Sequence, residues 1–108
     1  MQLPYVYIAG PYSQDDQAEN VRVAVEAANE VVRLNAIPFI PHLTHFWHLM
    51  TPKSYTFWLW YDLRWLPKCD MLLRLPGASN GADEEEKAAK RLGLPVFHGL
   101  DELRAALG

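Results

Sequence analysis

The sequence predicts an α/β fold: a three-layer, flavodoxin- or Rossmann-like domain whose parallel sheet of four or five strands carries helices on both faces. Two observations predict it. Four short segments rich in β-branched and aromatic residues alternate with longer segments of helical periodicity. Of the 108 residues, 50% are apolar and 21% charged, which is typical of a globular chain. The length suits one domain, residues 1–108, because neither a repeat nor a linker interrupts the alternation.

The first half of the chain alternates strand, helix and strand. Residues 5–9 read Tyr-Val-Tyr-Ile-Ala and stop at a Gly-Pro pair, which predicts a buried strand. Residues 17–34 repeat apolar side chains at steps of three and four, which predicts an amphipathic helix. Residues 37–40 predict a second strand. It should lie at a sheet edge because Pro38 has no N–H to donate.

The second half continues the alternation. The expected order is helix, strand, helix, strand and helix, at residues 52–66, 71–75, 82–92, 95–97 and 101–107. Pro52 suits the first turn of its helix, Gly93 suits the end of the next, and Asp101 suits the start of the last. Because right-handed crossovers join parallel strands, the expected strand order is 2-1-3-4.

In that order, the sequence of strands along the sheet reverses between the first and third strands. Ligands of open α/β sheets bind at such a point, beyond the carboxyl ends of the strands. Residues 9–12 from the first strand and 76–85 from the third should therefore line a crevice. The candidate ligand-binding residues are Gly10, Pro11, Tyr12, Ser79, Asn80, Gly81 and Ala82.

Ser79 to Ala82 open the expected third helix. Their backbone N–H groups and the helix dipole would bind an anion, to which the Ser79 hydroxyl adds a donor. Serine and asparagine are also ordinary helix caps, and capping alone explains them in most proteins. Their place at the expected crevice favours a binding role.

Carboxylates provide the candidate acid–base groups. Glu84, Glu85 and Glu86 are consecutive, and helical neighbours are about 100° apart, so only one or two of them can face the crevice. Asp62 lies among bulky apolar residues. It either pairs with a donor such as Arg64 or faces a cleft with a shifted pKa.

The segment 46–65 contains eight of the thirteen aromatic residues. One helix cannot bury so many rings against a single core, so some should face a second copy of the chain or a flat ligand such as a nucleobase. A homodimer or higher homo-oligomer through this segment is the expectation.

His42, His45 and His48 are three residues apart, which raises the possibility of a zinc site. Neither a carboxylate nor a thiolate stands nearby, so polar loop histidines are the favoured interpretation, and we expect no metal and no cofactor. Chelator insensitivity would remove the remaining alternative, a metal-dependent hydrolase. Cys69, the single cysteine, fits a small apolar side chain in a reducing cytoplasm.

A net charge of −3 argues against binding to polymeric nucleic acid through bulk positive charge. We find no apolar run of membrane-spanning length and no signal-peptide pattern at the start of the sequence. A cytoplasmic protein without a membrane partner is the expectation.

Several motifs together resemble the nucleoside 2-deoxyribosyltransferase-like superfamily, which includes the deoxynucleoside 5′-monophosphate N-glycosidases and many short members. They are Tyr7-Ile8-Ala9-Gly10-Pro11-Tyr12, Asp62, Asp70 and Ser79-x-Gly81-Ala82-x-x-Glu85-x-x-x-Ala89. The resemblance spans nearly the whole chain. It implies cleavage or transfer at the N-glycosidic bond of a nucleoside or nucleotide by a retaining mechanism.

The resemblance also implies roles for three residues. Glu85 would be the nucleophile, Tyr7 would hold its carboxylate by a hydrogen bond, and Asp62 would assist departure of the base. Members that act on monophosphates carry serine where this chain has Ser79, which favours a nucleotide 5′-monophosphate. A hydroxyl and helix-terminal amides also suit a phosphate better than a carboxylate would.

The expected chemistry requires Glu85 to be ionised and Asp62 to be protonated, so their surroundings should shift the two pKa values in opposite directions. The helix N-terminus and the Tyr7 hydroxyl should keep the pKa of Glu85 low, and apolar neighbours should raise that of Asp62. The main alternative is a non-catalytic nucleotide-binding or sensing module, which a nucleotide would stabilise without turnover. A flavodoxin-like signalling domain fits less well, because a phosphoacceptor aspartate is missing where Leu75 ends the third strand.

Overall fold

The computed structural model describes residues 2–108, which form one four-stranded parallel sheet. The strands are β1 (Tyr5–Ala9), β2 (Ile37–Phe39), β3 (Met71–Arg74) and β4 (Val96–His98). Their order is β2-β1-β3-β4, so the predicted topology is confirmed, and Pro38 lies in an edge strand as expected.

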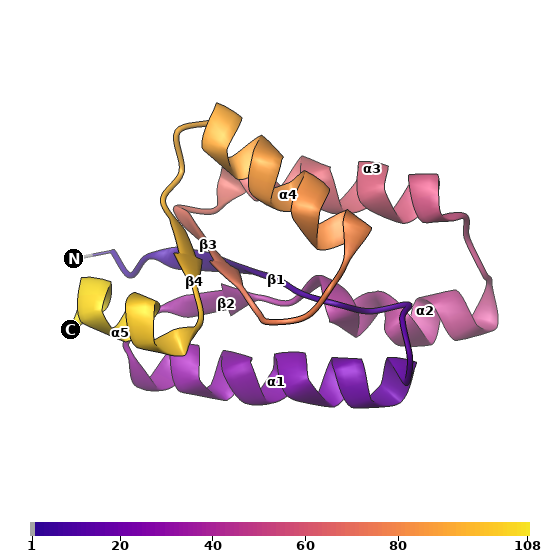
Figure 1. Ribbon diagram of the computed structural model, residues 1–108, viewed down its shortest axis with the longest axis horizontal. Coiled ribbons are helices and arrows are strands. Elements are labelled where there is room, and N and C mark those ends of the chain that lie inside the picture. Colours follow the sequence, from indigo (N-terminus) through magenta and orange to yellow (C-terminus); the bar gives the residue numbers. More distant parts are fainter. Residues whose placement is uncertain (1) are drawn as a thin grey trace.

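Helices cover both faces of the sheet, as Figure 1 shows. The longer ones are α1 (Gln17–Arg33), α3 (Tyr55–Trp65), α4 (Asn80–Arg91) and α5 (Leu100–Leu107). The helix α1 and the yellow helix α5 lie on one side of the sheet, and α3 and α4 lie on the other. This arrangement confirms the expected three-layer α/β fold.

Alternation along β1 divides the core into two parts. Val6 and Ile8 join the cluster under α1 and α5, and Tyr7 and Ala9 join the cluster under α3 and α4. Successive side chains of a strand point to opposite faces, so this division follows from the strand geometry. Consequently Tyr7 faces the helix that carries Glu85.

Three expected helix starts were wrong. The helix expected from residue 82 begins at Asn80, because the Ser79 side chain accepts a hydrogen bond from the N–H of Ala82 and caps the helix there. The helix expected from Pro52 begins at Tyr55, because the Ser54 side chain accepts a hydrogen bond from the N–H of Phe57 and caps the helix there. The last helix begins at Leu100 after Gly99, whose φ of 94° suits glycine, so Asp101 lies in the first turn and is not the cap.

The histidine segment is helical. It forms a short 3-10 helix, η1 (Pro41–Thr44), that continues into α2 (His45–Met50). The expectation of loop histidines was therefore wrong. A second 3-10 turn, η2 (Leu66–Lys68), precedes β3, and the Asp70 carboxylate accepts a hydrogen bond from the N–H of Tyr5.

The loops that follow β1 and β3 approach each other closely. Gly77 has a φ of 114°, and a Cβ on it would lie 2.8 Å from Pro11 Cγ. A Cβ on Gly10 would lie 3.0 Å from Leu75 Cβ. Only glycine fits at 77, so the loop before α4 can pass against the end of β1. The two strand ends meet at the expected switch point.

Candidate functional site

A cavity of about 420 Å³ lies at the carboxyl ends of β1 and β3. That volume falls within the roughly 300–1,000 Å³ of small-molecule sites. Its walls come from the loop after β1, from η1 to α3, and from the start of α4. The lining residues predicted from sequence are Gly10, Tyr12, Asp62, Ser79, Asn80, Gly81, Ala82 and Glu85.

Two predicted site residues do not line the cavity. Pro11 packs against Gly77, and its carbonyl accepts a hydrogen bond from Nε2 of His42, 3.1 Å away. Tyr7 is fully buried in the core under α4. Pro11 therefore contacts the loop before α4, and Tyr7 is joined to the cavity wall by its hydrogen bond to Glu85.

Glu85 is the glutamate of the 84–86 run that lines the cavity. It is only 6% exposed, whereas the side chain of Glu84 is about half exposed. The Tyr7 hydroxyl donates a hydrogen bond to Glu85 Oε2. A buried carboxylate is costly unless it is hydrogen-bonded, so this bond holds Glu85 in one orientation.

Burial dominates the acidity of Glu85. It raises the pKa of the carboxyl to about 8, although the Tyr7 hydrogen bond and the positive charge of Arg74 both lower it. The expectation of a low pKa was wrong, because the favourable groups do not compensate for loss of water around the buried charge.

Asp62 lines the same cavity from α3. Burial raises its pKa to about 7, as expected from its apolar neighbours. Among residues 2–108, no group forms a hydrogen bond with its Oδ1. The Arg64 guanidinium, the expected alternative partner, lies 5.5 Å from the ring centroid of Trp60. A negative charge on Asp62 raises the pKa of Glu85, so the two carboxyls titrate as a coupled pair.

These raised pKa values predict how stability depends on pH. Folding raises the carboxyl pKa from 4.5 to about 8 for Glu85 and from 3.8 to about 7 for Asp62. Between pH 4 and 8 the folded state therefore holds protons that the unfolded chain releases, and the free energy of unfolding should fall as pH rises. Each tenfold difference in proton affinity between the folded and unfolded states corresponds to about 1.4 kcal/mol.

Urea unfolding of the wild type and of Glu85→Gln, at intervals between pH 4 and 9, measures this dependence. The variant lacks one of the two carboxyls, so its stability should fall less across the window. Identical pH dependence in the two proteins would contradict the burial of an ionisable Glu85.

The three predicted histidines surround Tyr12. Its ring centroid lies 6.4, 5.5 and 6.2 Å from those of His42, His45 and His48, respectively. His45 Nδ1 lies 2.6 Å from the Tyr12 hydroxyl, and His48 Nδ1 accepts hydrogen bonds from Trp58 Nε1 and the N–H of Lys53. Within residues 2–108, no three His, Cys, Asp or Glu side chains are arranged to bind a metal ion.

Sequence reasoning missed part of the wall. Lys53 lines the cavity beside Tyr55 and Trp58, which belong to the aromatic segment 46–65 that was expected to face a partner copy or a flat ligand. Its Nζ lies 5.8 Å from the Trp47 ring and 5.5 Å from that of Phe57. Cation–π contact of this kind orients an ammonium group. The signal available in the sequence was an isolated lysine just before a serine cap.

Ser79 caps α4 as a helix start should. Its Oγ accepts a hydrogen bond from the N–H of Ala82 at 3.1 Å, which leaves its hydroxyl proton free to donate. Tyr55 packs beside this turn: a Cβ on Gly81 would lie 3.7 Å from the Tyr55 ring. The start of α4 thus presents a hydroxyl and backbone N–H groups to the cavity.

Comparison with known proteins places the chain in a family. A family model described as "Domain of unknown function (DUF7768)" matches residues 4–98. The chain belongs to the DUF7768 family. The matched residues of this DUF7768 domain include all those that line the cavity. None of the curated proteins compared with it matches the sequence.

A similar solved structure is that of a 2-deoxyribosyltransferase from the psychrotolerant bacterium Bacillus psychrosaccharolyticus, described as a biocatalyst for the synthesis of nucleosides. The TM-score is 0.63 at 21% identity, with 87% of this chain and 70% of that chain covered. This similarity confirms the predicted fold. Among the helices of residues 2–108, none is long and apolar enough to span a bilayer.

Proposed function

We propose that this protein cleaves or transfers the N-glycosidic bond of a nucleoside 5′-monophosphate or nucleoside, with Glu85 as nucleophile. The observation that carries the proposal is the buried Glu85, which lines the cavity together with Asp62 and is held by the Tyr7 hydroxyl. Retaining glycoside cleavage uses two carboxyl groups at one site, one as nucleophile and one as acid. The fold shared with a 2-deoxyribosyltransferase supports the same chemistry.

The first step forms a glycosyl-enzyme ester. A Glu85 oxygen bonds to C1′ of the sugar as the bond between C1′ and the base nitrogen breaks, and the electron pair of that bond leaves with the base. Asp62 donates its proton to the departing base. In the second step, water or a second base attacks C1′, loses a proton to the Asp62 carboxylate and frees Glu85.

One proton shared by the pair is the productive state. Glu85 must be ionised to attack and Asp62 protonated to donate. The Tyr7 hydrogen bond favours ionisation of Glu85 in that state. The pKa of Glu85 is about 8 and that of Asp62 about 7, so the pair holds one proton between these pH values, mainly on Glu85. The productive form, with the proton on Asp62, is therefore the minor of the two one-proton forms, and the reaction proceeds through it.

A monophosphate suits other groups that line the cavity. The free Ser79 hydroxyl proton and the N-terminal amides of α4 can donate to phosphate oxygens, and the Lys53 ammonium supplies positive charge. Tyr12 and Trp58 offer aromatic surfaces to a base.

The proposal is tested by incubating the protein with a panel of nucleosides and nucleoside 5′-monophosphates and measuring the free base by chromatography. We expect release from at least one monophosphate, with KM lower than for the matching nucleoside. Lys53→Met should raise the monophosphate KM by about tenfold and leave the nucleoside KM unchanged, because a charge-assisted hydrogen bond contributes about 1.5–3 kcal/mol. Folded protein that a nucleotide stabilises without any base release would instead favour the sensing module.

We further propose that copies of the chain associate through the aromatic segment 46–65 and act in the cytoplasm. Rings there pack on one another, yet Phe46 and Met50 are 72% and 84% exposed, and about half of Trp60 is exposed. An apolar surface of this kind is typical of an interface. Sedimentation equilibrium of the purified protein checks the association, and a monomer at micromolar concentration would exclude it.

A further inference from the structure

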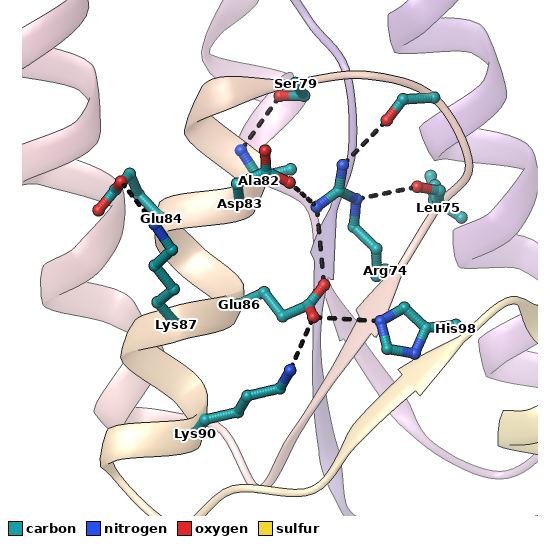
Figure 2. Close-up of polar contacts among 11 residues, drawn as sticks. Arg74, Leu75, Ser79, Ala82, Asp83, Glu84, Glu86, Lys87, Lys90 and His98 are labelled. Atoms are coloured by element: carbon teal, nitrogen blue, oxygen red, sulfur yellow. Dashed lines mark hydrogen bonds and ion pairs between the residues drawn. The ribbon is translucent and has the colours of Figure 1, made fainter.

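Arg74, the last residue of β3, is held in place by the loop that follows it. Its side chain is 12% exposed and points to the α4 face of the sheet. Its Nε donates to the Leu75 carbonyl at 3.1 Å, as Figure 2 shows. Its Nη2 donates to the Gly77 carbonyl at 2.9 Å. These two bonds fix the loop that leads to Ser79.

The remaining nitrogen of Arg74 reaches α4. Nη1 donates to Asp83 Oδ1 at 2.7 Å and lies 3.6 Å from Glu86 Oε1. The other Glu86 oxygen lies 3.0 Å from Lys90 Nζ and 3.2 Å from His98 Nε2 (Figure 2). One guanidinium therefore joins the end of β3, the following loop and the first turns of α4. A lysine could not make all these bonds, because its ammonium lacks the planar fork.

This network of ion pairs surrounds the turn of α4 that carries Glu85. Asp83 and Glu86 stand two residues before and one residue after it, and the network provides both with a cationic partner. Around Glu85 itself lie Tyr7 from β1, Asp62 from α3 and the charge of Arg74 from β3. Of these, Tyr7 and Arg74 favour the carboxylate form of Glu85, and Asp62 opposes it.

We propose that Arg74 is the positioning residue of the nucleophile: its guanidinium fastens the loop before Ser79 to the turn that carries Glu85 and neutralises the carboxylates beside it. This inference rests on the proposed function. Arg74 does not line the cavity, so it acts on the reaction through Glu85 and Ser79 and not by contact with the substrate.

Three variants separate charge from geometry. Arg74→Met removes both the charge and the bonds, and Arg74→Lys keeps the charge but loses the fork. Arg91→Met, at the exposed end of α4, removes an equal charge elsewhere and serves as the control. The measurements are kcat and KM for base release against pH, and the titration of the Glu85 carboxyl by carbon-13 NMR, assigned by its loss in Glu85→Gln.

In Arg74→Met, kcat should fall about 10- to 100-fold, and the pH midpoint for ionisation of Glu85 should rise. Arg74→Lys should restore the Glu85 midpoint but only part of kcat, and Arg91→Met should change neither. A folded Arg74→Met with wild-type kcat and wild-type Glu85 titration would overturn the inference. Should Arg74→Met fail to fold, an Arg74→Lys variant with unchanged kcat would overturn it.

The two proposals fail in different ways. If the wild type releases no base from any substrate, the proposed function fails, and the NMR titration still measures whether Arg74 acts on Glu85. If the wild type is active and the Arg74 variants match it, only the role of Arg74 fails.

Discussion

Replacing Glu85 with glutamine is expected to lower base release by about 10³-fold or more, because removal of a nucleophile leaves only binding and the remaining acid. The amide cannot form the glycosyl ester, yet it preserves the shape of the carboxyl and can accept the hydrogen bond from Tyr7. The variant should also be more stable than the wild type at pH 9, where Glu85 is a buried anion. Single-turnover base release and urea unfolding measure the two effects.

Glu84→Gln is the matched control. Glu84 precedes Glu85, forms a surface ion pair with Lys87 and has a half-exposed side chain. Its loss should change kcat less than about twofold, because exposed ion pairs contribute little. Equal losses in the two variants would contradict the assignment of Glu85, and so would a Glu85→Gln protein with wild-type activity.

Replacing Asp62 with asparagine is expected to cost about 10²- to 10⁴-fold in kcat, the range typical of a general acid. A change in the pH profile should accompany the loss. We expect wild-type activity to fall above pH 8, where the pair loses its last proton, and this fall should disappear in Asp62→Asn because no acid remains to be deprotonated. The fall at low pH should remain, because Glu85 must still lose its proton to attack.

The leaving group provides a sharper test of Asp62. An N7-methylated purine departs as a neutral base without gaining a proton, so Asp62→Asn should cleave its nucleotide with a much smaller loss. Asp70→Asn is the control carboxyl, because Asp70 bonds the N–H of Tyr5 and does not line the cavity. Equal losses on both substrates would contradict the acid role of Asp62.

Local patterns were sufficient to predict the fold. The helical repeat of residues 17–34 and the β-branched strands near Tyr7 and Leu72 are periodic signals, and short right-handed crossovers leave few strand orders. The alternation of β1 follows from the same signals. It places Tyr7 on the α4 face, from which its hydroxyl reaches Glu85 across 78 positions of sequence.

Other features depend on tertiary packing and could not be predicted from the sequence. The high pKa of Glu85 reflects how completely β1, α3 and α4 exclude water from it, and local residue types do not determine that. The histidines were expected in a loop. They lie instead in a helical segment whose histidine rings pack around Tyr12. Because Tyr12 follows β1, these ring contacts form only when the end of β1 is in place. Lys53 and Arg74 belong to no recognisable sequence motif. The rings beside Lys53 and the carbonyls and carboxylates beside Arg74 come together only in the folded chain.

Mass spectrometry of a trapped intermediate tests the central claim most directly. A 2′-fluorinated substrate slows breakdown of a glycosyl ester, because the fluorine destabilises the positive charge that develops at C1′. After brief reaction and acid quench, digestion should yield the peptide containing Glu85 with the added mass of the sugar, and the Glu85→Gln protein should yield none. Base release with the sugar attached to another residue, or with no adduct on any peptide, would contradict the account.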